Sequence, residues 1–250
     1  MSGHSKWHSI KHKKARVDAV RGKIFSRLIK EITVSAKIGG SNSEMNPRLR
    51  TAIQTAKSAN MPSKNIENAI KKGTGELPGI EYEEIVYEGY GPGGAAIYIN
   101  TLTDNKNRTV AEFRYLLNKH GGNLGESGCV AWMFEKKGLI KINKNNHDEE
   151  SVFMTAIDAG ADDMNSDDDE FYEIYTDSDN LYQVRDILEN NQFTVASAEH
   201  TMVPQNTVKL EGKNAEQMLK IMEVLDDHDD VQDIYANFDI DDEVMAKIAG

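Results

Sequence analysis

The spacing of apolar residues changes at a short glycine- and proline-rich segment, GTGELPG at 73–79. Before this segment, apolar residues recur every three or four positions, which is typical of amphipathic helices. After it, short apolar runs predict strands, and helical patterns separate them. We therefore expect an α+β fold in which a helical unit is followed by mixed α and β structure.

The residues before the linker predict an arm and three helices. SGHSKWHSIKHKK (2–14) has little apolar periodicity and is expected to order only on binding, whereas a helix is expected over 15–37. NPRLRTAIQTAKSAN predicts a second helix, with Asn46 as N-cap and Pro47 as its first residue. MPSKNIENAIKKGTG predicts a third helix that ends near Gly73.

The first of these helices has two contrasting faces. Its apolar face gathers residues that need partners in the next two helices: Val17, Val20, Ile24, Phe25, Leu28, Ile29, Ile32 and Ala36. The opposite face is a basic stripe of Arg16, Lys23, Arg27, Lys30 and Lys37. The helical unit is therefore expected to display cations outward.

The remainder predicts alternating strands and helices. GYGPGG is expected to be the turn of a hairpin, and CVAWMF (129–134) a buried strand. Between them, NKNRTVAEFRYLLNKH is expected to be a helix with Val110, Phe113, Leu116 and Leu117 buried. Between 135 and 203 the order β-α-β-α-β, with an extra short strand near 161–165, fits a ferredoxin-like module. The strand NTVKLEG, a helix and the strand DVQDIYANF complete the expected elements.

The charge of the chain is divided unevenly between these parts. The net charge is −12, yet residues 1–78 hold 16 Lys and Arg against 5 Asp and Glu, a net charge of +11. The other 172 residues hold 13 basic and 36 acidic residues, a net charge of −23. This division suggests a polyanion-binding module joined to an acidic part. The alternatives are that the two parts attract each other, or that the charged residues only form a solvated face with no binding role.

The sequence argues against several classes of protein. No run of about 18 apolar residues predicts a transmembrane helix, and the basic N-terminus is not followed by the apolar core of a signal peptide. The arm is rich in Lys rather than Arg, unlike a transit peptide. The only cysteine, Cys129, excludes an intrachain disulfide and a Cys-rich zinc site. We expect a cytoplasmic protein with no membrane partner.

Nucleotide and metal sites are also not expected. GYGPGG contains G-x-G-x-x-G, but a strand follows it instead of a helix, and HGGNLGESG (120–128) lacks the Lys-Ser/Thr end of a P-loop. His4, His8 and His12 are four residues apart, but the lysines around them oppose a cation. DDMNSDDDE lacks the glycine and the last glutamate of a calcium loop. We expect no enzymatic activity, no cofactor and no small-molecule substrate.

The basic part has the chemistry of a nucleic-acid-binding module. Lys and Arg neutralise phosphates and release counterions, and Ser5 and Ser9 can hydrogen-bond phosphate oxygens. Trp7 can stack on unpaired bases, which favours RNA or single strands, or it can instead pack the arm onto the helices. The expected contacts are Lys6, Trp7, His8, Lys11, His12, Lys13, Lys14 and Arg16 in the arm, and Arg21, Lys23, Arg27 and Lys30 in the first helix.

Long stretches of the chain closely resemble the YebC/PmpR family. They are GHSKWHSIKHKKARVDAVRGKIFSRLIKEI, NPRLRTAIQTAKSANMPSKNIENAIKKGTGE, YEGYGPGGAAIYINTLTDNKNRT and GGNLGESGCVAWMF, and MVP at 202–204 fits as well. The loop GGSNSEMNP lacks the Gly-Asp-Pro often found there, and Cys129 stands where serine is usual. Neither departure touches the basic module. The family pattern starts at Met1, which favours a bacterial cytosolic member.

The resemblance implies three domains. Residues 1–78 would form the basic arm and helical nucleic-acid-binding domain, 79–134 with 204–250 an α+β middle domain, and 135–203 a ferredoxin-like domain inserted into it. The resemblance also implies a DNA-binding transcriptional regulator without enzymatic activity. Because some relatives act as translational activators, a ribosome-associated factor that binds ribosomal RNA stays open as an alternative. A weaker alternative is a protein adaptor whose arm docks only on its own acidic part.

Overall fold

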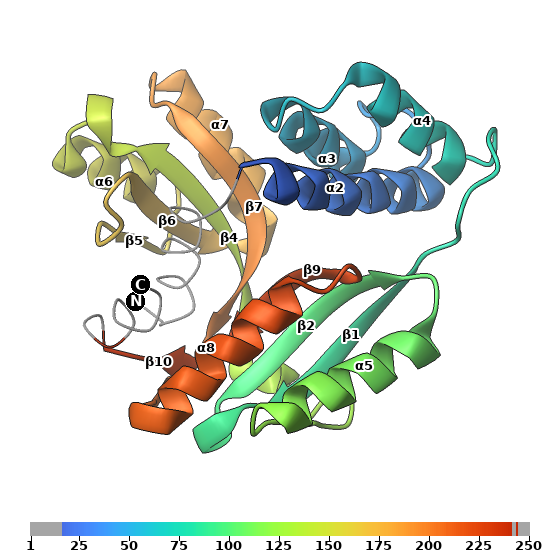
Figure 1. Ribbon diagram of the computed structural model, residues 1–250. Helices are drawn as coiled ribbons and strands as arrows, with labels where there is room; N and C mark the ends of the chain where they lie inside the picture. The colour runs from blue at the N-terminus through green and yellow to red at the C-terminus, as the bar shows by residue number, and fades with distance from the viewer. Residues whose placement is uncertain (1–16, 242–243, 245–250) are drawn as a thin grey trace.

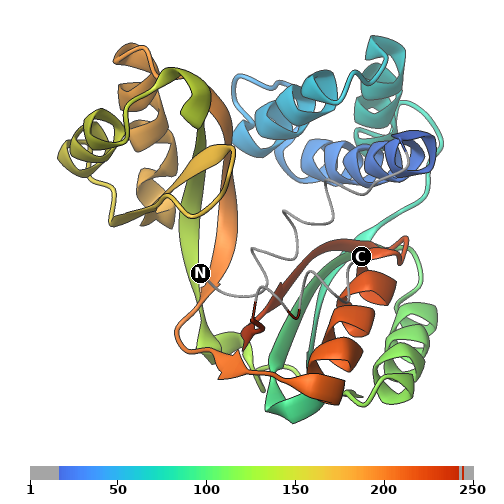
Figure 2. The ribbon, with the colours of Figure 1, turned by 60° about the vertical axis from the view of Figure 1, so that its left-hand side comes forward.

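The computed structural model describes residues 17–241 and 244, with side chains from residue 22 onward apart from Asn146. The described residues form three parts. The helices α2, α3 and α4 form one part, a sheet with β1, β2 and β9 lies beneath them, and a second sheet with β4, β6 and β7 lies beside both (Figure 1). Figure 2 shows the long strands β4 and β7 rising together from the first sheet into the second.

The helical part contains the three expected helices: α2 (Val17–Gly39), α3 (Pro47–Ser58) and α4 (Ser63–Gly73). The Asn46 side chain accepts a hydrogen bond from the backbone N–H of Leu49 at 3.1 Å, so the predicted N-cap is confirmed. The amide of Asn46 also donates to the carbonyls of Ser35 and Gly40 at 2.8 and 2.9 Å. One side chain thus fixes both the end of α2 and the start of α3. The core between the helices is apolar and includes Ile32, Leu49 and Ile66.

The helices α2 and α4 touch at a glycine. A Cβ added to Gly73 would lie 2.3 Å from the carbonyl oxygen of Thr33 and 2.9 Å from the Cβ of Ala36. No real side chain fits at such distances, so Gly73 permits the backbones to approach. The hydroxyl of Thr33 bridges the same contact by donating to the carbonyl of Ala69 at 3.3 Å.

The middle sheet has the strand order β3-β1-β2-β9. Its predicted hairpin is confirmed: β1 (Glu83–Tyr90) pairs antiparallel with β2 (Ala96–Thr103), and GYGPGG provides the turn. The short strand β3 (Asn123–Leu124) and the strand β9 (Val231–Ala236) form the two edges. Gly93 and Gly94 have φ of 70° and 81°, which explains glycine at both turn positions.

Two helices cover one face of this sheet: α5 (Lys106–Lys119) and α8 (Gly212–Asp226). Phe113 and Leu117 of α5 are buried against the sheet, as predicted, together with apolar residues of α8 such as Met218 and Met222. Val110 and Leu116, which were also expected to be buried, are only half-buried. The predicted strand NTVKLEG is reduced to β8 (Val208–Lys209), which pairs in parallel with β10 (Phe238–Asp239).

The second sheet confirms the ferredoxin-like topology. The order along the chain is β4 (Phe134–Asn143), α6 (Glu149–Asp158), β5 (Asp163–Asn165), β6 (Phe171–Asp177), α7 (Leu181–Asn190) and β7 (Val195–Pro204). The strands are arranged β5-β6-β4-β7, and all neighbours are antiparallel. A separate apolar core, which includes Ile140, Ile174 and Leu188, joins this sheet to its two helices.

The predicted strand CVAWMF is wrong. Residues Ala131–Met133 form a single 3₁₀ turn, and β4 begins only at Phe134. The carboxylate of Glu88, which is 4% exposed, accepts from the backbone N–H groups of Gly128, Val130 and Ala131 at 2.6 to 2.7 Å. These donors are therefore satisfied by a side chain and not by a neighbouring strand, while Trp132 is 64% exposed.

Candidate nucleic-acid interface

The predicted contacts divide into those outside and those within the described residues. Lys6, Trp7, His8, Lys11, His12, Lys13, Lys14 and Arg16 lie outside the described part of the chain. Arg21 lies on α2, but its side chain is outside the described set. Lys23, Arg27 and Lys30 are described, and they lie on one face of α2 together with Lys37.

Three cations of this basic stripe, Lys23, Arg27 and Lys30, face the segment 226–230 between α8 and β9, which we name the acidic turn. Lys23 Nζ lies 2.7 Å from an oxygen of Asp227, and Arg27 Nη2 lies 3.1 Å from an oxygen of Asp226. The Arg27 guanidinium also donates to the carbonyl of Asp226. The side chains of Lys23 and Arg27 retain 24% and 22% of their exposure, so both are largely covered by these contacts.

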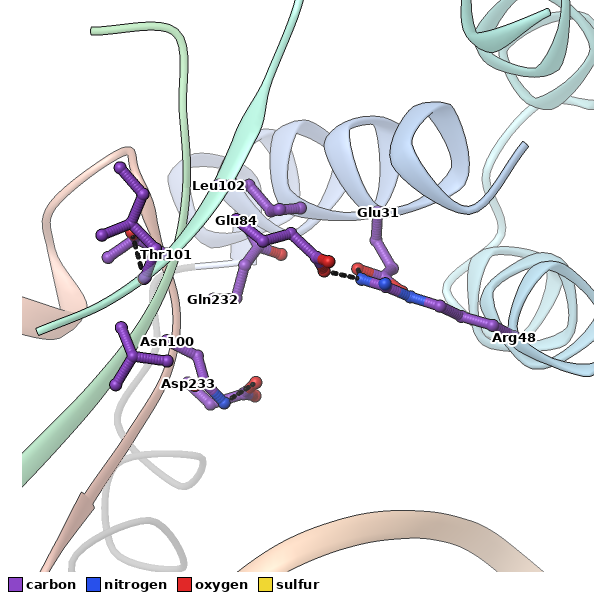
Figure 3. A pocket seen from close by; sticks show the side chains of 10 residues that line it. Glu31, Arg48, Glu84, Asn100, Thr101, Leu102, Gln232 and Asp233 are labelled. Atoms are coloured by element: carbon purple, nitrogen blue, oxygen red, sulfur yellow. Dashed lines mark hydrogen bonds and ion pairs between the residues drawn. The ribbon is translucent and has the colours of Figure 1, made fainter. Parts of the chain in front are cut away.

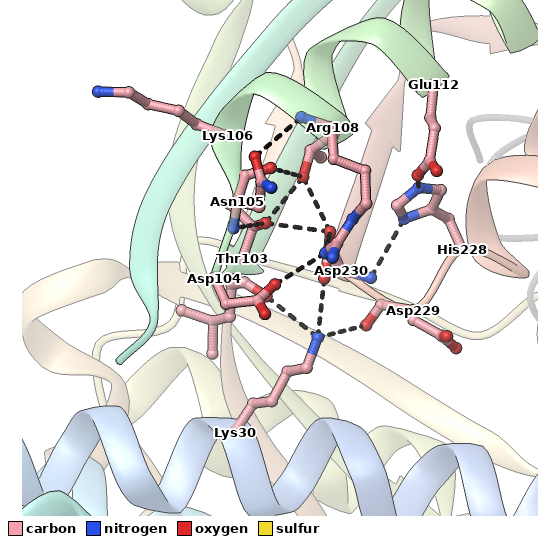
Figure 4. Close-up of polar contacts among 12 residues, drawn as sticks. Lys30, Thr103, Asp104, Asn105, Lys106, Arg108, Glu112, His228, Asp229 and Asp230 are labelled. Atoms are coloured by element: carbon pink, nitrogen blue, oxygen red, sulfur yellow. Dashed lines mark hydrogen bonds and ion pairs between the residues drawn. The ribbon is translucent and has the colours of Figure 1, made fainter. Parts of the chain in front are cut away.

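Lys30 makes the innermost contact of the stripe (Figure 4). Its Nζ donates to Asp230 Oδ1 at 3.0 Å and to the carbonyls of Leu102 and Asp229 at 3.2 and 2.9 Å. All three donors of the ammonium group are therefore used within the chain. The side chain is 12% exposed, and that of Asp230 is 2% exposed.

Asp230 gathers donors from two further elements. Its Oδ2 accepts from Arg108 Nη2 at 2.8 Å, from Thr109 Oγ1 at 2.8 Å and from Thr103 Oγ1 at 3.1 Å. Burial alone would raise the pKa of the Asp230 carboxyl, but the donors of Arg108, Lys30 and Thr109 outweigh it and hold the pKa well below its ordinary value. The carboxylate is thus charged, and donors from the protein replace the hydrogen bonds that it would make with water.

The acidic turn is the partner of these cations within the chain. It offers the cations of α2 the ligand chemistry that a phosphate backbone would offer, namely negatively charged oxygens at hydrogen-bond distance. A phosphate that approaches Lys23, Arg27 or Lys30 therefore competes with a carboxylate already bound there. These cations share one face of α2, as predicted, but the prediction that they are displayed outward is wrong, because the acidic turn covers them.

A hollow of about 300 Å³ lies farther along α2, between the helices and the middle sheet (Figure 3). Arg48 Nε and Nη2 bind both oxygens of Glu31 at 2.6 and 2.9 Å, and the guanidinium also contacts Glu84. The hollow is lined by Glu31, Glu84 and Asp233 but by a single cation. Its net negative charge opposes a phosphate, so it does not extend the interface.

A second set of cations is free of carboxylates within the described residues. These side chains are exposed on α3 and α4: Arg50, Lys57, Lys64, Lys71 and Lys72. Residues seven apart in a helix share a face, which places Arg50 with Lys57 on α3 and Lys64 with Lys71 on α4. Outward cations were predicted for this part of the chain, but none of these five residues was among the predicted contacts. Their spacing of seven residues was the signal that could have identified them.

Other candidate sites have structural explanations. Asp168 Oδ1 accepts from the backbone N–H groups of Glu170 and Phe171 at 2.8 and 2.9 Å, which closes the acidic loop as a turn. Burial raises the pKa of the Cys129 thiol, which opposes a reactive thiolate. Within residues 17–241 and 244, no three His, Cys, Asp or Glu side chains are placed to hold a metal ion. The helices of the same residues include none that is both long and apolar enough to span a membrane.

The fold and the surface define an α+β protein with a cationic helical part set against an acidic two-sheet body. Comparison with known proteins gives its family. A profile for the TACO1/YebC protein N-terminal domain matches residues 5–76, and one for the TACO1/YebC second and third domain matches residues 82–238. The chain belongs to the TACO1/YebC family.

The family assignment is supported by relatives over the full length. A probable transcriptional regulatory protein of Geobacter sulfurreducens is 59% identical over 99% of this chain and 100% of that protein. One from Natranaerobius thermophilus is 58% identical over 98% and 99% of the two chains. The crystal structure of a conserved hypothetical protein from Aquifex aeolicus is 49% identical and superposes with a TM-score of 0.87, covering 94% of this chain and 97% of that one.

Proposed function

We propose that this protein is a non-enzymatic regulator of gene expression that binds nucleic acid through residues 1–72. The observation that carries the proposal is the charge division: a net +11 in residues 1–78 against −23 in the rest. Binding of DNA or RNA is dominated by phosphate neutralisation, so the cationic helical part is the surface that a polyanion would contact. The names of the relatives, probable transcriptional regulatory proteins, support a role in regulation.

The cations of this part have different roles in the proposal. Those of the arm (Lys6, Lys11, Lys13, Lys14 and Arg16) contact phosphates, with Trp7, His8 and His12 beside them for bases or backbone. Arg21, Lys23, Arg27 and Lys30 contact phosphates in turn, but the last three first exchange the carboxylates of the acidic turn for phosphate oxygens. This exchange makes binding by α2 weaker than its charge alone would give.

The proposal has two versions, which differ in the ligand: promoter DNA or ribosomal RNA. The name of the relatives favours promoter DNA. A basic arm that carries Trp7 among Lys and His favours ribosomal RNA, because aromatic side chains stack on unpaired bases. In the first version the protein regulates transcription in the cytoplasm; in the second it acts as a translation factor on the ribosome.

Fluorescence anisotropy tests the shared claim. The full chain is titrated into a labelled DNA duplex, a labelled single-stranded RNA and a labelled ribosomal RNA hairpin at several salt concentrations. We expect the logarithm of the association constant to fall linearly with the logarithm of the salt concentration. Absence of binding to all three at low salt contradicts the proposal.

Sucrose-gradient sedimentation separates the two versions. Lysate is fractionated at low and raised salt, and the protein is followed by immunoblot. Co-migration with ribosomes that is lost as salt rises identifies the translation version. Protein that stays at the top of the gradient at low salt removes that version and leaves promoter DNA as the ligand.

A further inference from the structure

Helix α6 of the ferredoxin-like sheet has a buried apolar face and, beside it, a second set of apolar residues that is partly exposed. Val152 and Ala156 are fully buried in the core of that sheet. Phe153, Met154 and Ile157 are not among the residues of that core and are 40%, 55% and 40% exposed. With 3.6 residues per turn, these three side chains are neighbours on one face. The fold covers part of each of these three side chains, and the exposed part is available to another molecule.

The surroundings of this exposed face are strongly acidic. Residues 145–184 contain 13 Asp and Glu and no Lys or Arg, and Lys137 of β4 pairs with two of these carboxylates, Asp162 and Asp177. Glu150 lies one turn before Phe153 and Met154, and Glu149 and Asp158 flank the same helix. Figures 1 and 2 show α6 at the outer edge of the molecule, on the side away from α2–α4. The apolar face is therefore framed by carboxylates and unobstructed by the helical part.

The charge selects among occupants. Nucleic acid and anionic membranes are repelled by the carboxylates. A second copy of this chain, joined by a two-fold contact, would place the same acidic residues opposite one another. A protein segment that combines apolar residues with Lys or Arg satisfies both the apolar face and its frame.

We propose that the exposed face of α6 is a docking surface for a basic amphipathic helix of another protein. Phe153, Met154 and Ile157 take the apolar side chains of that helix, spaced three or four residues apart. Glu149, Glu150 and Asp158 pair with the cations at its margins. This surface is separate from the nucleic-acid interface proposed above and does not depend on it.

The test uses a labelled synthetic helix of about 18 residues, with Leu along one face and Lys elsewhere. A second peptide has the same lysines and Gln in place of every Leu. Binding to the full chain is measured by fluorescence anisotropy. The variant Phe153→Gln/Met154→Gln/Ile157→Gln removes the apolar face with residues that favour helix. The control replaces three exposed apolar residues on other surfaces: Ile38→Gln/Met45→Gln/Tyr115→Gln.

We expect the Leu/Lys peptide to bind the parent chain and the control variant equally. The α6 variant should bind it at least about tenfold more weakly, and the Gln/Lys peptide should bind all three weakly. Circular dichroism and thermal unfolding of each variant establish that the fold is retained.

Three results would overturn the proposal. The first is no binding of the Leu/Lys peptide to the parent chain. The second is equal affinity for the parent and the α6 variant, which would mean that general electrostatic attraction explains the binding. The third is concentration-dependent self-association in sedimentation velocity that the α6 variant abolishes, which would make a second copy the occupant.

Discussion

Asp230 joins three elements of the fold through one carboxylate. It binds Lys30 of α2, Arg108 and Thr109 of α5, and Thr103 at the end of β2. A buried carboxylate is stabilising only when donors replace the water it has lost, and here all the donors come from charged or hydroxyl groups. The residue thus couples the helical part to the middle sheet.

Replacement of Asp230 by asparagine should lower the free energy of unfolding by about 2 to 3 kcal/mol, because Lys30 and Arg108 lose their shared counter-charge. Denaturant unfolding at pH 7 measures the change. Asp229→Asn is the matched control, because Asp229 is exposed and contributes its carbonyl to Lys30. An Asp230→Asn variant as stable as the control would show that the ion pairs add nothing.

The same substitution has a predicted pH dependence. The pKa of Asp230 in the folded chain lies below the ordinary 3.8, so its contribution is complete above about pH 5 and is lost as pH falls. The difference in unfolding free energy between the parent and Asp230→Asn should therefore shrink below about pH 4. A difference that stays constant from pH 7 to pH 3 would contradict the assignment of this pKa.

At the scale of elements, local signals predicted most of the helices and strands. Asn46 followed by Pro47 marked the start of α3, and GYGPGG marked the hairpin turn. The prediction of a strand at CVAWMF was wrong because the apolar composition of this segment carries no information about Glu88. Glu88 lies 40 residues before Gly128 and accepts a hydrogen bond from its backbone N–H group. Sequence periodicity reports which residues need burial; it does not report which distant side chain satisfies the backbone.

Two glycines in the helices should respond to alanine with opposite signs. Gly73→Ala should lower the free energy of unfolding by about 2 kcal/mol or more, since its Cβ would meet the backbone of α2 at 2.3 Å. Gly22→Ala should raise it by about 0.5 to 1 kcal/mol, because its Cβ meets nothing within 4 Å and alanine favours helix. Thermal and denaturant unfolding test both variants, and equal effects would refute the close approach of α2 and α4.

At the scale of the whole molecule, the charge division has two consequences. It predicted a polyanion-binding part, and in the structure it also holds that part against the acidic turn. Attraction between the two parts was one of the alternatives left open by the sequence, but the residues that pair could not be predicted, because Lys30 and Asp230 lie 200 residues apart and only the fold brings them together. The predicted boundaries of the three domains, at 78, 134 and 203, stay a prediction that limited proteolysis can address.

Weakening the acidic turn should strengthen nucleic-acid binding. Asp226→Asn/Asp227→Asn releases Arg27 and Lys23 from their ion pairs, so a phosphate no longer has to displace a carboxylate. We expect affinity for a labelled duplex or RNA to rise about three- to tenfold. Asp167→Asn/Glu170→Gln makes the same charge change on the distant ferredoxin-like sheet and should raise affinity less. Equal gains would show that net charge, and not the contact, controls binding.

The central claim is that the N-terminal basic part binds nucleic acid, and the salt dependence of the arm tests it most directly. Affinity of the full chain for a labelled duplex is measured from low to moderate salt, for the parent and for Lys11→Ala/Lys13→Ala/Lys14→Ala. If all three lysines contact phosphates, the slope of log affinity against log salt should fall in magnitude by about 3, with weaker binding to every sequence. An unchanged slope would remove the arm from the interface and contradict the account.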